Sequence, residues 1–173
     1  MTTTIETTKV TESQMVAAWT AILQPYFAIE NEVWGKHWRG DSMRIDMVLY
    51  PKFQWQGGGK FPIGFEIKGS DVNEAKLIGQ AVDYANTQWH SAFYDEPIEM
   101  FIAVYAPMYQ NKPRCKDHGI ILTEQMLGRL GVAHFDIDDH YGLNLRVSGQ
   151  RMWSQRNGAE GPNWSAKRKF GSR

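Results

Sequence analysis

The 173-residue sequence contains one cysteine, Cys115, and lacks any apolar run long enough to cross a bilayer. A single cysteine excludes an internal disulfide and a cysteine-based zinc site. A membrane-spanning helix needs about 20 consecutive apolar residues. The first residues also lack the basic and apolar segments of a secretory signal peptide. We therefore expect a cytoplasmic protein that forms one compact domain and has no contact with a membrane.

Several catalytic motifs are missing as well. No glycine-rich loop is followed by Lys-Ser or Lys-Thr, so the sequence has no P-loop for a nucleotide phosphate. None of the five histidines stands in the pattern of a zinc-dependent or HNH nuclease. Cys115 lies in a polar segment without an evident partner, which argues against a cysteine hydrolase.

Acidic and basic residues balance over the whole chain, but they are unevenly distributed. Residues 1–145 hold 12 Lys and Arg against 18 Asp and Glu, whereas residues 146–173 hold 7 against 1. We therefore divide the chain into a domain over 1–145 and a basic C-terminal extension over 146–173. Basic side chains bind phosphates, so the extension is either a DNA contact or a flexible, solvated tail. Its candidate DNA-binding residues are Arg151, Lys167, Arg168 and Lys169.

The most informative feature is a pair of strand-like segments that carry charge among apolar residues. Asp46 interrupts the apolar run 45–49, and Glu66-Ile67-Lys68 ends a second apolar segment. Side chains alternate along a strand, so Glu66 and Lys68 project from one side. If the two strands pair, two carboxylates and an ammonium meet in one place. That is unfavourable unless the charges are paired or bind a metal.

Such an arrangement suits metal-assisted hydrolysis. Carboxylate oxygens are the ligands that Mg²⁺ prefers, and a bound cation activates water and neutralises charge on a phosphate. A neighbouring lysine can orient or deprotonate that water, or stabilise the transition state. The alternative is an exposed strand face on which these charges are solvated.

The segment that follows supplies a second motif. Gln80 and Tyr84 are four residues apart, so they share one face of a helix expected over about 72–89. Asp71 and Glu74 have the spacing of a capping box at its start. Its apolar face is expected to consist of Val72, Ala75, Ile78, Val82 and Ala85. Alone, the pair is better explained by a surface glutamine and a tyrosine at the edge of the core, and only the strand motif upstream favours a site.

In this order, Asp46, Glu66-Ile67-Lys68 and the Gln80/Tyr84 pair resemble the PD-(D/E)xK nuclease superfamily, with the QxxxY motif of its RecB, Cas4 and lambda-exonuclease-like branches. The resemblance covers roughly residues 10–105, and Ile45 stands where the family usually has a proline. It implies an α/β, restriction-endonuclease-like fold with an α-β-β-β-α-β core, in which helices flank a mixed central sheet. It also implies cleavage of DNA with Mg²⁺ or Mn²⁺.

By this resemblance, Asp46 and Glu66 hold the metal together with a backbone carbonyl near Ile67. Lys68 positions or deprotonates the attacking water. Loss of Lys68 should therefore abolish turnover but not metal binding, whereas loss of Asp46 should abolish both.

The remaining roles are carried over in the same way. Gln80 assists the water or a phosphate oxygen, and Tyr84 steadies the helix or contacts the DNA backbone, for which Arg44 is a further candidate. In many such nucleases the first helix supplies another acid. Glu12 is our first candidate for it, and Glu32, in the preceding strand, is the alternative.

Periodicity and turn residues predict the other elements. A helix capped by Thr11 extends to Pro25, a strand covers Tyr26–Trp34, and Gly35–Asp41 forms a turn. The later expectations are a strand at 43–50, a glycine loop at 57–59, a strand at 61–68, a strand at 98–106, a loop at 107–119, a helix at 123–130, a strand at 132–135 and a hairpin at 141–147.

The segment His134–His140 has the composition of a metal cluster. Alternation along a strand divides its side chains between two faces. We interpret it as a solvated strand end followed by an acidic turn.

Two other functions stay open. One is a nuclease fold that no longer cleaves and instead binds DNA ends, or binds and inhibits a host nuclease or defence protein. The acidic balance of residues 1–145 favours it, because duplex DNA repels a negative surface. The other is a Holliday-junction resolvase, which requires a homodimer.

Overall fold

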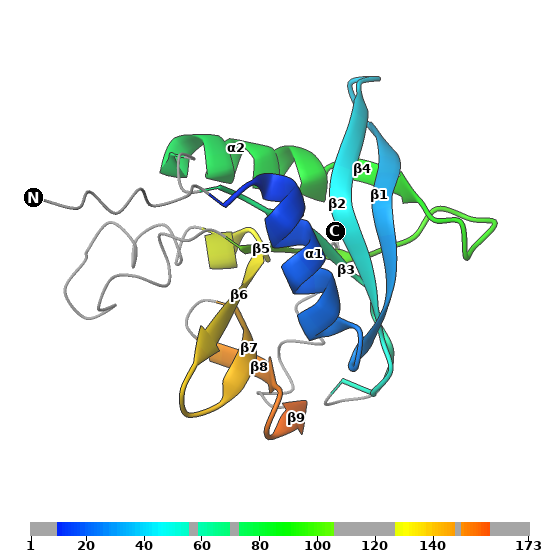
Figure 1. Ribbon diagram of the computed structural model, residues 1–173. Helices are drawn as coiled ribbons and strands as arrows, with labels where there is room; N and C mark the ends of the chain where they lie inside the picture. The colour runs from blue at the N-terminus through cyan, green and yellow to red at the C-terminus, as the bar shows by residue number, and fades with distance from the viewer. Residues whose placement is uncertain (1–9, 56–58, 70–72, 106–126, 148–149, 160–173) are drawn as a thin grey trace, which may run out of the picture.

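The chain is described by a computed structural model over residues 10–55, 59–69, 73–105, 127–147 and 150–159 (Figure 1). In chain order the elements are α1 (Glu12–Leu23), β1 (Phe27–His37), β2 (Ser42–Pro51), β3 (Ile63–Ile67), α2 (Glu74–Ala85), β4 (Thr87–His90), β5 (Phe101–Tyr105), β6 (Ala133–Asp138), β7 (Gly142–Val147), β8 (Gln150–Ser154) and β9 (Gly158–Ala159). The strands within the described ranges form one sheet with the order β4-β1-β2-β3-β5-β6-β7-β8-β9.

The sheet is mixed, which confirms the α/β class. At its centre β3 runs parallel to β5, and β5 runs parallel to β6. The other neighbouring strands pair antiparallel. A parallel connection needs a crossover, and α2 lies in the one between β3 and β5. The order α1-β1-β2-β3-α2 is the expected one.

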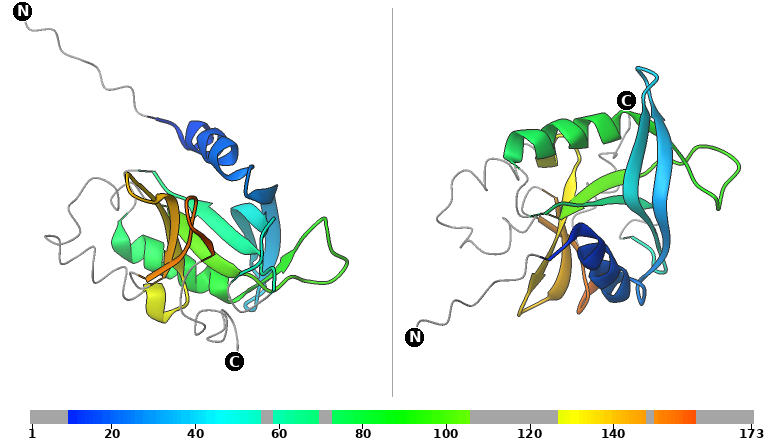
Figure 2. Two further views of the ribbon diagram at one scale, coloured as in Figure 1. Left: turned by 90° about the horizontal axis from the view of Figure 1, so that it is seen from below. Right: turned by 45° about the horizontal axis from the view of Figure 1, so that its top comes forward.

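The two helices cover opposite faces of the sheet, with strands between them (Figure 2, left). On one face, Trp19 and Leu23 of α1 pack in a core with Phe65 and Phe135. The ring centroids of Trp19 and Phe65 are 5.2 Å apart, in an edge-to-face contact. On the other face, Leu77, Ala81 and Tyr84 of α2 form a second core with Val48, Ile102 and Val104. The sheet is therefore buried on both sides at β2, β3 and β5.

Both helices begin at a side-chain cap. Thr11 accepts a hydrogen bond from the backbone N–H of Gln14, and the Gln14 side chain returns to the Thr11 backbone, so the predicted cap of α1 is confirmed as a capping box. For α2 the cap is Asn73, which accepts from Lys76, so the helix starts later than expected. Asp71 lies outside the described residues. No helix in the described ranges has the length and apolar character needed to cross a membrane.

Strand β1 is longer than expected, and β4 was not expected. The segment around Gly35, predicted as a turn, continues β1 to His37 and pairs with β4. A Cβ on Gly35 would lie 2.5 Å from the Thr87 side chain and 2.7 Å from the Trp89 ring. The glycine is thus required by close packing of β4, which the sequence pattern does not reveal. Strand β5 starts at Phe101 rather than 98, and Ile98 forms an isolated bridge to Trp89.

The buried face of α2 differs from the predicted one. We expected Val72, Ala75, Ile78, Val82 and Ala85 to form it, but Ala75, Val82 and Ala85 are exposed. The buried residues are Leu77, Ala81 and Tyr84. Both sets have helical spacing, and the true one is rotated toward Tyr84 because the tyrosine ring packs edge-on against Trp89 at 5.4 Å.

Part of the predicted C-terminal extension belongs to the sheet. Residues 150–159 form β8 and β9, with Trp153 and Met152 buried in the core on the α1 side. The predicted hairpin at 141–147 is strand β7, which pairs with the longer-than-expected β6. Of the helix expected at 123–130, residues 127–129 are described and helical. Residues 106–126 and 160–173, including Cys115 and Lys167, lie outside the described ranges.

Candidate functional site

Strands β2 and β3 stop pairing where the charged residues lie. Their antiparallel ladder ends at the pair Met47 and Phe65. One step further, the same register brings Asp46 opposite Glu66, at the spacing where cross-strand side chains interact directly. Beyond the ladder, a side chain replaces the backbone as hydrogen-bond acceptor: the Asp46 Oδ2 accepts a 2.7 Å hydrogen bond from the backbone N–H of Ile67. The Asp46 charge also raises the pKa of Glu66, so the two carboxylates lie near each other at the open end of the strand pair.

Side-chain alternation changes phase at Asp46. Ile45 packs in the core on the α2 side and Met47 packs in the core on the α1 side. On a regular strand these two residues would share a face. In β1, between the residues that pair with Ile45 and Met47, Glu32 has a φ of 53°, a left-handed conformation that non-glycine residues rarely adopt. The irregularity buries the apolar residues on both sides of Asp46 and leaves its carboxylate half-buried.

The surroundings of Asp46 disfavour the charged form of its carboxyl group. Burial raises the pKa of Asp46 above its ordinary value, and the Glu12 carboxylate raises it further. The Ile67 N–H, Lys68 and Arg44 act in the opposite direction without cancelling these effects. A carboxylate held in this way gains from any additional positive charge.

Glu66 is the most buried acid of the group, with 4% of its surface exposed. Its Oε1 accepts hydrogen bonds from the Lys68 ammonium and, at 3.0 Å, from the Gln80 side-chain amide. Its Oε2 is buried and has no hydrogen-bond partner. Burial raises the pKa of Glu66, and the Asp46 charge raises it further against the lowering effect of Lys68. One ammonium thus faces two carboxylates, and one carboxylate oxygen is left unsatisfied.

Helix α2 is tied to this site by Gln80 and Tyr84. The Gln80 amide donates both to Glu66 and, at 2.6 Å, to the Tyr84 hydroxyl. The hydroxyl in turn donates to the backbone carbonyl of Arg44 at 2.8 Å. Burial, followed by the Glu66 charge, raises the pKa of Tyr84, so the phenol stays a donor at neutral pH. The chain of hydrogen bonds connects α2 to β2 and fixes the Glu66 carboxylate between them.

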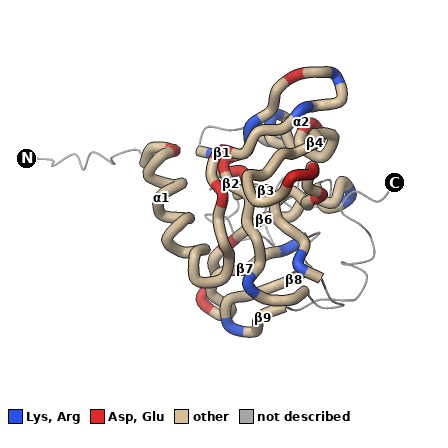
Figure 3. The backbone as a smooth tube through the Cα atoms, turned by 90° about the vertical axis from the view of Figure 1, so that its right-hand side faces the viewer, with Lys and Arg blue, Asp and Glu red and all other residues tan. Residues whose placement is uncertain are grey.

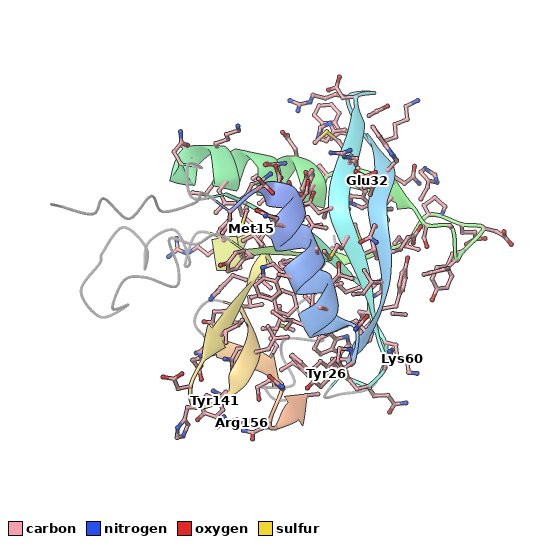
Figure 4. The ribbon with its side chains drawn as sticks, in the orientation of Figure 1. Met15, Tyr26, Glu32, Lys60, Tyr141 and Arg156 are labelled. Atoms are coloured by element: carbon pink, nitrogen blue, oxygen red, sulfur yellow. The ribbon has the colours of Figure 1, made fainter. Side chains whose placement is uncertain are left out.

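The two candidates for a further acid differ in their surroundings. Glu12, in the first turn of α1, is near enough to raise the pKa of Asp46. Glu32 instead forms an ion pair with Arg44 at 3.0 Å and lies on the β1–β2 hairpin (Figure 4). Of the two candidates, Glu12 is thus the one whose charge acts on Asp46, whereas Glu32 is paired with Arg44.

The residues present fit a divalent cation. The unpartnered Oε2 of Glu66 and the facing Asp46 carboxylate offer oxygen ligands of the type that Mg²⁺ and Mn²⁺ take. Within the described ranges, no three His, Cys, Asp or Glu side chains converge closely enough to bind a metal by themselves. A cation here would be completed by water and backbone oxygen, as is common for Mg²⁺.

The predicted DNA-binding residues are scattered. Arg44 is half exposed beside the site. Tyr84 is 3% exposed with its hydroxyl bonded inward, so it serves to position α2 and does not offer a DNA contact. Arg151, on β8, lies with its guanidinium 3.4 Å from the centroid of the Tyr141 ring. Figure 3 shows acidic segments beside β1 and β2 and basic ones beside β7 and β8. Lys167, Arg168 and Lys169 lie outside the described residues.

A second charged cluster occupies the α2-side face of β6 and β7. We predicted a solvated strand end over His134–His140, but His134 and Asp136 are 3% and 5% exposed. Arg146 pairs with Asp136 at 3.3 Å and with Asp138 at 3.0 Å. Backbone N–H groups of His140 and Tyr141 also donate to Asp138. The prediction was wrong because burial here depends on distant parts of the chain, whereas the acidic turn at Asp138 is confirmed.

One partner in the site could not be found from sequence motifs. The acceptor for Tyr84 is a main-chain carbonyl, that of Arg44, which any residue would supply equally well. The left-handed backbone at Glu32 could not be predicted either, because the sequence has a glutamate and not a glycine at this position. The charged residues themselves were all visible in the motif, and the structure brings Asp46, Glu66, Lys68 and Gln80 together.

No protein family matches the sequence, and no curated protein or solved structure shows significant similarity to it.

Proposed function

We propose that the protein is a metal-dependent nuclease that hydrolyses DNA phosphodiester bonds at the Asp46 and Glu66 site. The observation that carries the proposal is the buried Glu66 carboxylate, which has an unpartnered oxygen and faces a second carboxylate. Such an arrangement destabilises the protein unless a cation binds. The order α1-β1-β2-β3-α2 and the placement of Gln80 beside Glu66 support the restriction-endonuclease-like core that the resemblance implies.

Asp46 and Glu66 are the residues that would hold Mg²⁺ or Mn²⁺, and Glu12, whose charge acts on Asp46, is the candidate for a further acid. When bound, the cation supplies an activated water and neutralises charge on the phosphate. The backbone N–H of Ile67 fixes the orientation of the Asp46 carboxylate. By the resemblance, the carbonyl near Ile67 is a further ligand.

Lys68 lies on the same side of β3 as Glu66 and is held by it. As a charged ammonium, Lys68 orients the attacking water and stabilises negative charge that develops on the phosphate. The hydrogen bond to Glu66 fixes the ammonium beside the carboxylate pair, so the geometry favours the orienting role of Lys68.

Gln80 and Tyr84 act as positioning residues. Gln80 donates to Glu66 and Tyr84 donates to the backbone of β2, so together they fix the two strands that carry the carboxylates. Gln80 is also near enough to the Glu66–Lys68 pair to assist a water or a phosphate oxygen bound there.

Cleavage of linear, circular and single-stranded DNA with Mg²⁺ or Mn²⁺ tests the proposal, comparing wild type with Lys68→Ala. We expect metal-dependent cleavage that the variant lacks while it still binds metal in calorimetry. Cleavage of circles identifies an endonuclease. If no DNA is cut and no metal binds, the proposed nuclease is contradicted, and the alternative of a binding protein on a nuclease-like scaffold is favoured.

Light scattering tests the resolvase alternative, because a monomer cannot place two sites on one junction.

A further inference from the structure

A strip of exposed aromatic and basic side chains extends from the site along the β1–β2 hairpin. Trp34 on β1 is 57% exposed, and Trp38 in the following turn is 73% exposed. Lys36 lies between them and is also exposed. On β2, the Arg44 guanidinium lies over the Trp34 ring, 6.0 Å from its centroid. Two indoles this exposed, on one short stretch of a hairpin, are unusual for a surface without a binding role.

These residues share one face of the hairpin. Trp34 pairs directly with Arg44 across the two strands. Val33, Gly35 and His37, which alternate with them along β1, are buried. In the part of the hairpin that follows Glu32 along β1, the outward face therefore carries Trp34, Lys36 and Arg44.

The strip lies beside Asp46. Asp46 follows Arg44 by two residues on β2, and the Arg44 charge acts to lower the pKa of Asp46. The paired ends of β1 and β2 project past α1, so the helix does not cover this face (Figure 1). Figure 4 shows Glu32 on this projecting part of the hairpin.

We propose that this strip binds unpaired nucleotides, with Trp34 and Trp38 stacking on bases and Lys36 and Arg44 contacting phosphates. It leads a single strand, or the frayed end of a duplex, to Asp46 and Glu66. The inference rests on the proposed function and specifies its substrate as DNA with unpaired bases.

The chemistry of the strip distinguishes this ligand from others. Base faces are accessible for stacking only when the bases are unpaired, and both indoles and guanidinium groups stack on them. Paired duplex DNA offers phosphates but hides its base faces, so it would use the basic residues alone. Glu32 holds Arg44 at 3.0 Å in the free protein, and a phosphate would compete for the same guanidinium.

Binding of a fluorescein-labelled oligothymidylate of about 12 nucleotides, in EDTA so that no cleavage occurs, tests the strip directly. We expect the double variant Trp34→Ala/Trp38→Ala to bind at least about tenfold more weakly than wild type. Trp34→Phe, which keeps an aromatic face, should retain most of the affinity. Phe93→Ala removes an aromatic residue of the β4–β5 connection that is equally exposed, at 58%, and should bind like wild type. A blunt duplex of equal length should bind more weakly to wild type and respond little to the tryptophan changes.

The outcomes separate the strip from the nuclease activity. Unchanged oligothymidylate affinity in the double variant overturns the inference, even if Lys68-dependent cleavage is observed. So does tryptophan-dependent binding to anionic lipid vesicles with no binding to the oligonucleotide. Conversely, tryptophan-dependent binding without metal-dependent cleavage by wild type supports the strip and contradicts the proposed nuclease.

Discussion

Two charged clusters lie on the same sheet and differ in how their charges are balanced. In the first, Asp46 and Glu66 share one ammonium, that of Lys68. In the second, Arg146 contacts both Asp136 and Asp138. Both clusters combine two carboxylates with basic side chains, Lys68 in the first and Arg146 in the second, where the His134 Nε2 also lies 3.9 Å from the Asp136 Oδ2.

The difference lies in geometry and in the direction of the pKa shifts. Burial raises the pKa of both Asp46 and Glu66, and a neighbouring carboxylate raises each further, Glu12 in the case of Asp46 and Asp46 in the case of Glu66. The pKa of Asp138 is lowered, because two backbone N–H groups and Arg146 outweigh its partial burial. The Arg146 guanidinium can contact two carboxylates at once, whereas the Lys68 ammonium is held by Glu66. We call the first cluster charge-deficient, because its ammonium is held by one of the two carboxylates, and the second balanced, because its guanidinium contacts both. A charge-deficient cluster favours a ligand site, whereas a balanced one favours a structural role.

The largest expected effect concerns activity. Asp46→Asn removes one carboxylate of the deficient pair and should lower metal-dependent DNA cleavage by more than about a hundredfold. The matched change Asp136→Asn, in the balanced cluster, should leave cleavage per folded molecule within about twofold. Initial rates on a fluorescent oligonucleotide, with the folded fraction measured by circular dichroism, check both values. Equal losses in the two variants would mean that the clusters do not differ in function.

The next effect concerns stability. Arg146→Met leaves Asp136 and Asp138 without their shared guanidinium and should lower the free energy of unfolding by about 3 kcal/mol. Arg156, whose guanidinium donates to the His140 carbonyl, is exposed and provides a control. Arg156→Met should cost less than about 0.5 kcal/mol. Urea denaturation measures both, and a small effect at Arg146 would show that the second cluster is not structural.

The first cluster was predictable because its signals are local. Alternation on β3 places Glu66 beside Lys68, and four-residue spacing places Gln80 beside Tyr84. Neither inference needs knowledge of distant contacts. The strand order around them followed from short hairpin connections, which constrain β1, β2 and β3 to neighbour one another.

The features that sequence reasoning missed depend on packing. The change of phase at Asp46 is visible only once Ile45 and Met47 are seen in different cores. Strand β4 exists because Gly35 lets Trp89 approach β1 closely. Burial of His134 cannot be inferred from its neighbours in sequence, because what covers a strand is decided elsewhere in the chain. The same holds for the buried face of α2, where two sets of residues had equal periodicity.

A smaller effect tests the charge deficit without catalysis. In EDTA at neutral pH, Asp46→Asn should raise the free energy of unfolding by up to about 1 kcal/mol, because it removes a like charge opposite Glu66. The asparagine oxygen can still accept from the Ile67 N–H, so the local fold is kept. Mg²⁺ should raise the melting temperature of wild type but not of the variant. If Asp46→Asn is less stable than wild type without metal, the first cluster has no charge deficit.

The smallest effect is a difference in sign between two aspartates. The folded-state pKa of Asp46 is raised, so its charge destabilises the metal-free protein. The stability of wild type relative to Asp46→Asn should therefore fall as pH rises from the ordinary aspartate value of 3.8 through the folded value.

For Asp138 the folded-state pKa is lowered, so its charge stabilises the protein above the ordinary value, and that contribution is lost as pH falls through the folded value. The Asp138 side chain is 33% exposed, which limits the effect to about 0.5 kcal/mol. Thermal denaturation in EDTA across the acid range, with wild type, Asp46→Asn and Asp138→Asn, measures both differences. Raising the pH should favour wild type over Asp138→Asn and disfavour it against Asp46→Asn. If both stability differences changed with pH in the same direction, the two carboxylates would have similar surroundings. The assignment of one cluster as a ligand site would then lose its electrostatic basis.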